Sequence, residues 1–189
     1  TRRDHLPAVL DFAFQAAVRD VLGKGKGTVV LAEMFDGDVL YEGGEAAARR
    51  LPTFLGNHDM GRFSTLLKED RPGIASNELL ARVTLGHAML LTLRGAPVIY
   101  YGDEQGFVGD GGDQAAREDM FPSRVASYND NALIGTAATT ASSNFDENHP
   151  LFRVIASLSA IRRSQPALSG GAQIVRDYAQ TPGLFSVSR

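Results

Sequence analysis

A short apolar run, residues 51–56, stops at three adjacent polar residues, Asn57, His58 and Asp59. This pattern is typical of a buried parallel strand whose carboxyl end opens into a site. Active sites of α/β proteins collect at such strand ends, because the sheet fixes the backbone while the tips stay accessible. The alternative is a capped turn, in which Asn57 or Asp59 is the cap and His58 has only a local partner. The triplet alone does not decide between the two.

The composition is that of an ordinary globular protein. Of the 189 residues, 43% are hydrophobic and 22% are charged, which suits one domain or slightly more. The net charge of −3 does not indicate the positively charged surface that binds nucleic acid. The absence of cysteine excludes disulfides and thiolate metal sites, and no stretch reaches the roughly 18 apolar residues of a membrane span. We therefore expect neither a nucleic-acid nor a membrane partner, and the compartment stays open.

Apolar periodicity predicts strands and helices in alternation, the signature of parallel βαβ units. We expect strands at residues 6–14, 51–57 and 96–101. We expect helices at residues 14–22, 28–41 and 78–94, the last of them capped by Ser76 or Asn77, and a fourth that starts at Pro150. A long polar segment, residues 105–148, is predicted to be a functional loop. Two strands of a hairpin should follow, at residues 173–179 and 184–188.

Three stretches together resemble the alpha-amylase family. Residues 54–59, Phe-Leu-Gly-Asn-His-Asp, resemble the Phe-x-x-Asn-His-Asp motif that ends the family's seventh barrel strand. Residues 95–104, Gly-Ala-Pro-Val-Ile-Tyr-Tyr-Gly-Asp-Glu, are similar to its eighth strand. Residues 149–168 are similar to its last barrel helix. Each motif alone is only moderately specific, but their order and spacing make a strong resemblance.

The family fold is a (β/α)₈ TIM barrel, which typically needs about 250 residues. Only three barrel strands are expected here, corresponding to strands six to eight. The resemblance therefore implies an α/β chain whose residues 1–168 are the C-terminal part of a barrel, followed by the start of a β-domain at residues 169–189. A partial barrel exposes sheet edges and apolar interior. We expect the isolated chain to associate with itself or with the missing N-terminal half of the barrel.

Members of this family are retaining glycosidases that act on α-glucosidic bonds, so the resemblance implies an enzyme with an α-glucan or maltooligosaccharide substrate. Asp59 matches the aspartate that helps to stabilise the transition state, and His58 matches the histidine that donates to the same sugar. Asn57 would hold the turn and is a further candidate for a sugar contact. The nucleophile and the general acid belong to upstream strands. We therefore expect this segment alone to be inactive.

Three more residues are candidates for sugar contacts. Asp113 and Arg117 follow strand eight and match a loop of the family, where they could line a sugar subsite or form an internal salt bridge. Arg62 could likewise contact substrate or pair with an acid. Glu33 resembles the family's general acid, but it lies too close in sequence to Asp59, since one βαβ unit takes about 30 residues. We expect Glu33 to be a solvated helix residue.

No cofactor or metal is predicted for this segment, although the intact protein could bind calcium, which the family holds through other segments. The four histidines lack the His-x-x-x-His spacing of a metal site. One rival interpretation is a non-catalytic sugar-binding or structural domain of the same ancestry. Another is a complete small α/β domain with a dinucleotide or phosphate site. The sequence has no Gly-rich phosphate-binding motif after a strand, which argues against this interpretation.

Overall fold

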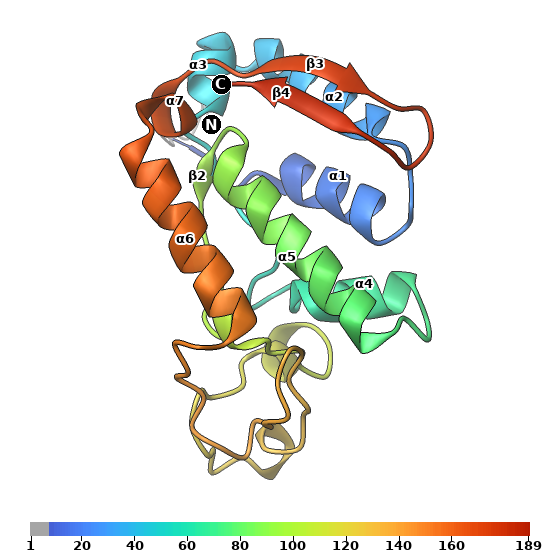
Figure 1. Cartoon of the computed structure of the whole chain (residues 1–189), viewed down its shortest axis with the longest axis vertical. Helices are drawn as coiled ribbons and strands as arrows, with labels where there is room; N and C mark the ends of the chain where they lie inside the picture. Colours follow the sequence, from blue (N-terminus) through green and yellow to red (C-terminus); the bar gives the residue numbers. More distant parts are fainter. Residues whose placement is uncertain (1–7) are drawn as a thin grey trace.

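The computed structural model describes residues 8–189, which form helices of different lengths and two small sheets (Figure 1). The helices are α1 (Phe12–Leu22), α2 (Val29–Asp36), α3 (Gly44–Ala48), α4 (Phe63–Asp70), α5 (Ser76–Thr92), α6 (Pro150–Ser164) and α7 (Pro166–Gly170). The strands are β1 (Pro52–Thr53), β2 (Ala96–Pro97), β3 (Ile174–Tyr178) and β4 (Phe185–Ser188). Short 3-10 turns are η1 (Gly37–Leu40), η2 (Asp103–Gln105), η3 (Asp113–Ala116) and η4 (Ala126–Tyr128).

The parallel sheet is shorter than predicted. β1 pairs with β2 in parallel, with Pro52 opposite Ala96 and Thr53 opposite Pro97. Strands were expected at residues 51–57 and 96–101, but only two residues of each form regular strand pairs. A barrel strand is held by a neighbour on each side, and the described residues provide β2 with β1 alone. The segment is therefore mixed α/β, and its described residues form no closed barrel.

The strand predicted at residues 6–14 is wrong where the structure describes it, and residues 6 and 7 lie outside the described part. Residues 8–11 belong to no strand, and α1 already begins at Phe12. The Asp11 side chain caps this helix by accepting from the Phe14 amide at 3.0 Å. The segment still lies beside β1, because the Asp11 amide donates to the Pro52 carbonyl at 2.9 Å.

The predicted helices form, with shifted ends. α5 begins at Ser76 with Ala75 as its N-cap, so the cap expected at Ser76 or Asn77 is wrong by one or two positions. The helix expected at residues 28–41 is split into α2 and η1. Glu33 is exposed on α2, as predicted. α6 begins at Pro150, where the His149 side chain accepts from the Leu151 amide at 3.2 Å.

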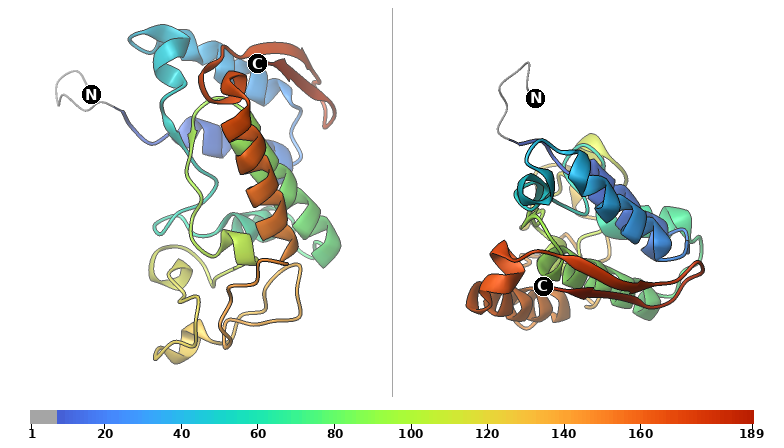
Figure 2. Two further views of the ribbon diagram at one scale, coloured as in Figure 1. Left: turned by 60° about the vertical axis from the view of Figure 1, so that its left-hand side comes forward. Right: turned by 90° about the horizontal axis from the view of Figure 1, so that it is seen from above.

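The core lies between α1, α4 and α5 and fixes the chain on both sides of the polar triplet. Leu55 before the triplet and Phe63 after it are both buried in the hydrophobic cluster that also contains Phe14 and Leu90. A Cβ at Gly86 of α5 would lie 2.6 Å from the Phe63 ring, so glycine permits this close approach. α6 packs along α5 (Figure 2). No helix within residues 8–189 is long and apolar enough to cross a bilayer.

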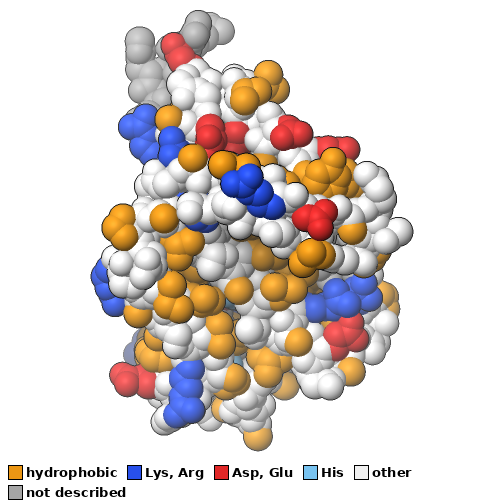
Figure 3. Space-filling view, turned by 45° about the horizontal axis from the view of Figure 1, so that its top comes forward, with side chains coloured by type: hydrophobic (Ala, Val, Ile, Leu, Met, Phe, Trp, Pro, Cys, Tyr) orange, Lys and Arg blue, Asp and Glu red, His pale blue; other side chains and the backbone are white. Residues whose placement is uncertain are grey.

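The predicted hairpin is present as the antiparallel pair β3–β4, which lies alongside α2 (Figure 1). Phe185 stacks on Phe35 with ring centroids 6.1 Å apart. The Thr28 hydroxyl donates to the Leu184 carbonyl at 2.7 Å and accepts from the Ala179 amide at 2.8 Å. Hydrophobic side chains gather across the middle of the face shown in Figure 3. Residues of β4, α1, α2 and α5 line an apolar cavity of about 340 Å³. The domain boundary near residue 168 stays a prediction.

A buried ion cluster ties three parts of the fold together. The Arg94 guanidinium, which precedes β2, donates to the two Asp38 carboxylate oxygens at 2.6 and 2.5 Å and also contacts the Asp11 carboxylate. All three side chains are almost fully buried. Burial raises the pKa of Asp38, although the hydrogen bonds and charge of Arg94 oppose that shift. Burial works to lower the pKa of Arg94, but the two carboxylates outweigh it and raise that pKa.

Candidate functional site

The polar triplet lies in a tight turn at residues 57–61. The Asn57 amide donates to the Gly61 carbonyl at 3.2 Å, and the Gly61 amide donates back to the Asn57 carbonyl at 3.0 Å. The Asn57 side-chain oxygen accepts from the amides of Asp59 and Met60, both at 2.9 Å. Gly61 has φ of 99°, which only glycine adopts readily. Asn57 therefore holds the turn, and its side-chain oxygen is turned to the backbone.

His58 and Asp59 project from this turn into solvent. Their side chains are 58% and 71% exposed, and His58 Nε2 lies 3.3 Å from Asp59 Oδ1. Neither side chain is packed under apolar neighbours. A carboxylate and an imidazole are thus presented together at the end of the segment that begins with β1, and both keep capacity to bind a ligand.

The segment after η2 folds over the turn and brings Asp113 and Arg117 beside it. Arg117 Nη2 lies 2.5 Å from Asp113 Oδ1 and 3.5 Å from Asp59 Oδ1. Arg117 Nε donates to the His58 carbonyl at 3.4 Å, and the Asp113 amide donates to the Asp59 carbonyl at 3.0 Å. The predicted salt bridge is therefore present. Asp113 and Arg117 remain 67% and 37% exposed and can still meet a ligand.

The structure contradicts a substrate contact for Arg62 and favours the other option, a pair with an acid. Its side chain has no exposed surface. Nη1 donates to the Tyr101 carbonyl at 2.6 Å and lies 3.4 Å from Asp103 Oδ1. The guanidinium carbon lies 4.6 Å from the centre of the Tyr100 ring and 4.9 Å from that of Phe107. This enclosure leaves no route for a sugar.

Sequence reasoning missed the acid that follows Arg117. Glu118 is fully buried, with Oε2 3.5 Å from Arg62 Nε, and its Oε1 accepts from Asn131 Nδ2 at 2.9 Å. Burial raises the pKa of Glu118, and the charge of Arg62 opposes that shift. Only the proximity of Glu118 to Arg117 in the chain could have drawn attention to it. Burial likewise raises the pKa of Tyr100, whose hydroxyl donates to the Ala116 carbonyl at 3.0 Å.

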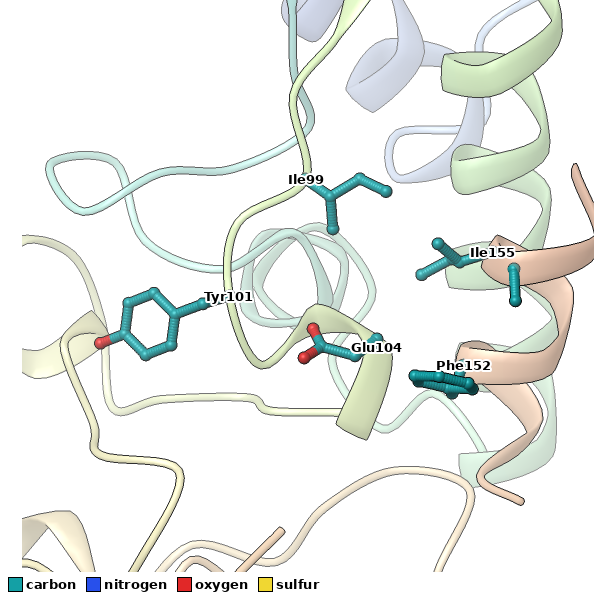
Figure 4. A pocket seen from close by; sticks show the side chains of 6 residues that line it. Ile99, Tyr101, Glu104, Phe152 and Ile155 are labelled. Carbon is teal, nitrogen blue, oxygen red and sulfur yellow. The ribbon is translucent and has the colours of Figure 1, made fainter. Parts of the chain in front are cut away.

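A second feature lies between the segment that follows β2 and helix α6. Residues that follow this strand and residues of α6 line a cavity of about 440 Å³ (Figure 4), namely Ile99, Tyr101, Glu104, Phe152, Ile155 and Ala156. Its lining is apolar apart from the Glu104 carboxylate and the Tyr101 hydroxyl. Among residues 8–189, no group of three or more His, Asp or Glu side chains could hold a metal ion.

Comparison with known proteins gives one consistent family. The family model "Alpha amylase, catalytic domain" matches residues 1–171. The chain is 45% identical to an alpha-amylase of Streptomyces lividans over 184 residues, which cover 97% of this chain and 20% of that protein. It is 30% identical to a beta/alpha-amylase of Paenibacillus polymyxa over 169 residues, which cover 89% of this chain and 12% of that protein.

Solved structures show the same likeness. The cyclomaltodextrin glucanotransferase CldA superposes with a TM-score of 0.67 at 30% identity, over 95% of this chain and 29% of that one. An Anoxybacillus alpha-amylase superposes with a TM-score of 0.69 at 22% identity, over 99% of this chain and 34% of that one. The chain spans a fifth or less of the two curated relatives just named. It belongs to the alpha-amylase family, as a segment of that family's larger catalytic domain.

Proposed function

We propose that this segment supplies part of the active site of a retaining enzyme that cleaves α-glucosidic bonds in starch-like glucans. Asp59 stabilises the transition state, and His58 holds the same sugar. The observation that carries the proposal is the joint exposure of these two side chains at the end of the β1 segment. Relatives also bind such ligands: a Geobacillus thermoleovorans alpha-amylase is complexed with acarbose and AmyP with maltotriose.

The chemistry follows from the charge that develops on the sugar. The transition state of glycoside hydrolysis resembles an oxocarbenium ion, and hydrogen bonds to sugar hydroxyls strengthen as it forms. The Asp59 carboxylate accepts from these hydroxyls, and its negative charge favours the growing positive charge. His58 Nε2 lies at the same edge and donates to the same ring. The nucleophile and the general acid, about 5 Å apart in a retaining enzyme, come from upstream of this segment.

The open side of β2 suits the upstream part of the barrel. An edge strand has unpaired backbone groups, and the apolar cavity between the segment after β2 and helix α6 adds surface that a packed neighbour would bury. We propose that the preceding barrel units pack here. Packing of these units would close the sheet and place the upstream carboxylates beside the exposed turn at residues 57–61.

Stereochemistry tests the proposed function. When the full-length protein cleaves a maltooligosaccharide, proton NMR of the fresh products should show the α-anomer first, because a retaining enzyme displaces at the anomeric carbon twice. Initial release of the β-anomer would contradict a retaining mechanism. The pure 189-residue chain should give no turnover under the same conditions. Sugar binding without cleavage by the full-length protein would favour a non-catalytic sugar-binding domain instead.

The position of Arg117 predicts a binding defect. Arg117→Ala in the full-length protein should raise KM for a maltooligosaccharide about tenfold, because Asp59 and Asp113 lose the cation between them and repel. Steady-state kinetics measures the change, with kcat affected less than KM. Arg124→Ala is the matched control, since Arg124 is an exposed arginine of the same segment. An equal effect of both variants would contradict a role for Arg117 at the site.

A further inference from the structure

Glu118 makes contacts that suit a structural anchor of the site. One carboxylate oxygen accepts from Asn131, and the other lies 3.5 Å from Arg62 Nε without a hydrogen bond. Both members of the Arg62–Glu118 pair have no exposed surface. Charges that are removed from water attract each other more strongly than exposed ones. The pair is therefore a buried electrostatic link between Arg62, which directly follows the turn at residues 57–61, and the segment at residues 109–118.

The side-chain contacts of Arg117 at the surface are too weak to hold it beside Asp59 on their own. Arg117 approaches Asp59 at 3.5 Å and the His58 carbonyl at 3.4 Å, and its side chain is partly in water. Exposed ion pairs of this kind are worth about 0–1 kcal/mol. Arg62 directly follows the turn that carries Asp59, and Glu118 directly follows Arg117. The buried pair thus joins the two chain segments close to the groups that meet at the surface, since Arg62 lies three residues after Asp59 and Glu118 lies one residue after Arg117.

We propose that Glu118 is a positioning residue, which holds Arg117 beside Asp59 by anchoring its segment to Arg62. This proposal rests on the proposed function, because it assumes that Asp59 and Arg117 meet a sugar. Glu118 itself is buried and touches no substrate.

Stability separates positioning from a merely structural role. Burial raises the pKa of Glu118, so its stabilising contribution is present below its unfolded pKa and is lost as pH rises through the folded pKa. Glu118→Gln keeps the size of the side chain and an acceptor for Asn131, and it stays neutral at every pH. In the variant Arg62 keeps Asp103 at 3.4 Å as a partner, and the cost of burying the Glu118 charge is removed. Above the folded pKa of Glu118, we therefore expect the variant to melt within a few degrees of the wild type.

A double-mutant cycle in the full-length protein tests the proposal. Glu118→Gln, Arg117→Ala and the double variant are assayed on a maltooligosaccharide, with melting temperatures measured alongside. We expect Glu118→Gln to lower kcat/KM about tenfold, since small misplacements of positioned groups are costly. In the Arg117→Ala background, Glu118→Gln should lower kcat/KM by less than about twofold, because the side chain that Glu118 positions is already absent. Asp119→Asn removes the neighbouring negative charge and should leave kcat/KM unchanged.

Three results would overturn the positioning role. The first is an unchanged kcat/KM in Glu118→Gln. The second is an equal loss of kcat/KM in the wild-type and Arg117→Ala backgrounds. The third is a loss of kcat/KM that is accompanied by a large fall in melting temperature. Failure of the proposed function looks different, because the wild type would then not cleave α-glucans. If the wild type is active and Asp59→Asn is not, while Glu118→Gln keeps full activity, only the positioning role is wrong.

Discussion

Replacing Asp59 with asparagine in the full-length protein is expected to lower kcat roughly 10²–10³-fold, the loss typical when one preorganised stabilising group is removed. The variant keeps the shape of the side chain but loses its charge, so it no longer favours the positive charge that develops on the sugar ring. The fold should be unaffected, because the Asp59 side chain is 71% exposed and the residue is held to Asn57 through its backbone amide. Steady-state kinetics and a melting curve measure both effects.

Asp130→Asn provides the matched control for this prediction. Asp130 is an exposed aspartate in the segment between η4 and α6, and it forms no ion pair among the described residues. Its replacement changes the net charge by the same amount and should leave kcat unchanged. If Asp59→Asn retains wild-type kcat, Asp59 takes no part in the reaction, and the proposed mechanism is wrong.

The largest effect on stability is expected at Arg94. Arg94→Met keeps most of the volume but leaves the buried carboxylates of Asp11 and Asp38 without their cation. Removing one partner of a buried ion pair costs about 3–5 kcal/mol. The free energy of unfolding, measured by chemical denaturation of the transition that includes this segment, should fall by that amount. The defect should shrink as pH falls, because burial raises the pKa of Asp38 and the variant lacks Arg94, which opposes that shift, so protonation of Asp38 removes the unpaired charge.

A compensating variant identifies the cause of this loss. Adding Asp11→Asn and Asp38→Asn to Arg94→Met removes the orphaned charges, and the amide oxygen introduced by Asp11→Asn can still accept the capping hydrogen bond from the Phe14 amide. The triple variant should regain much of the lost stability. If it stays as unstable as Arg94→Met, packing of the arginine side chain, rather than charge, stabilises this cluster.

The exposed half of the site could be predicted from the sequence because it is local. His58 and Asp59 follow an apolar run directly, and Asn57 satisfies the amides two and three residues onward, so short-range geometry presents both side chains. The hairpin and the start of α6 were predictable for the same reason, through alternation and a proline at the first helical position.

The buried half could not be predicted, because it depends on which segments meet. Nothing in the sequence around Arg62 indicates that Tyr100, Phe107 and Glu118 enclose it, and so the sequence leaves both a sugar contact and a pair with an acid open for this arginine. The predicted lengths of the parallel strands were wrong for a related reason. Apolar runs indicate where a strand can form, but ladder hydrogen bonds need neighbours, and the described residues give β2 only β1.

A crystal structure of the full-length protein with acarbose tests the central claim most directly. The account predicts an Asp59 carboxylate oxygen within about 3.2 Å of a sugar hydroxyl, with His58 at the same ring. A sugar ring bound in the barrel mouth with Asp59 more than about 6 Å from it, beyond any hydrogen bond, would contradict the account.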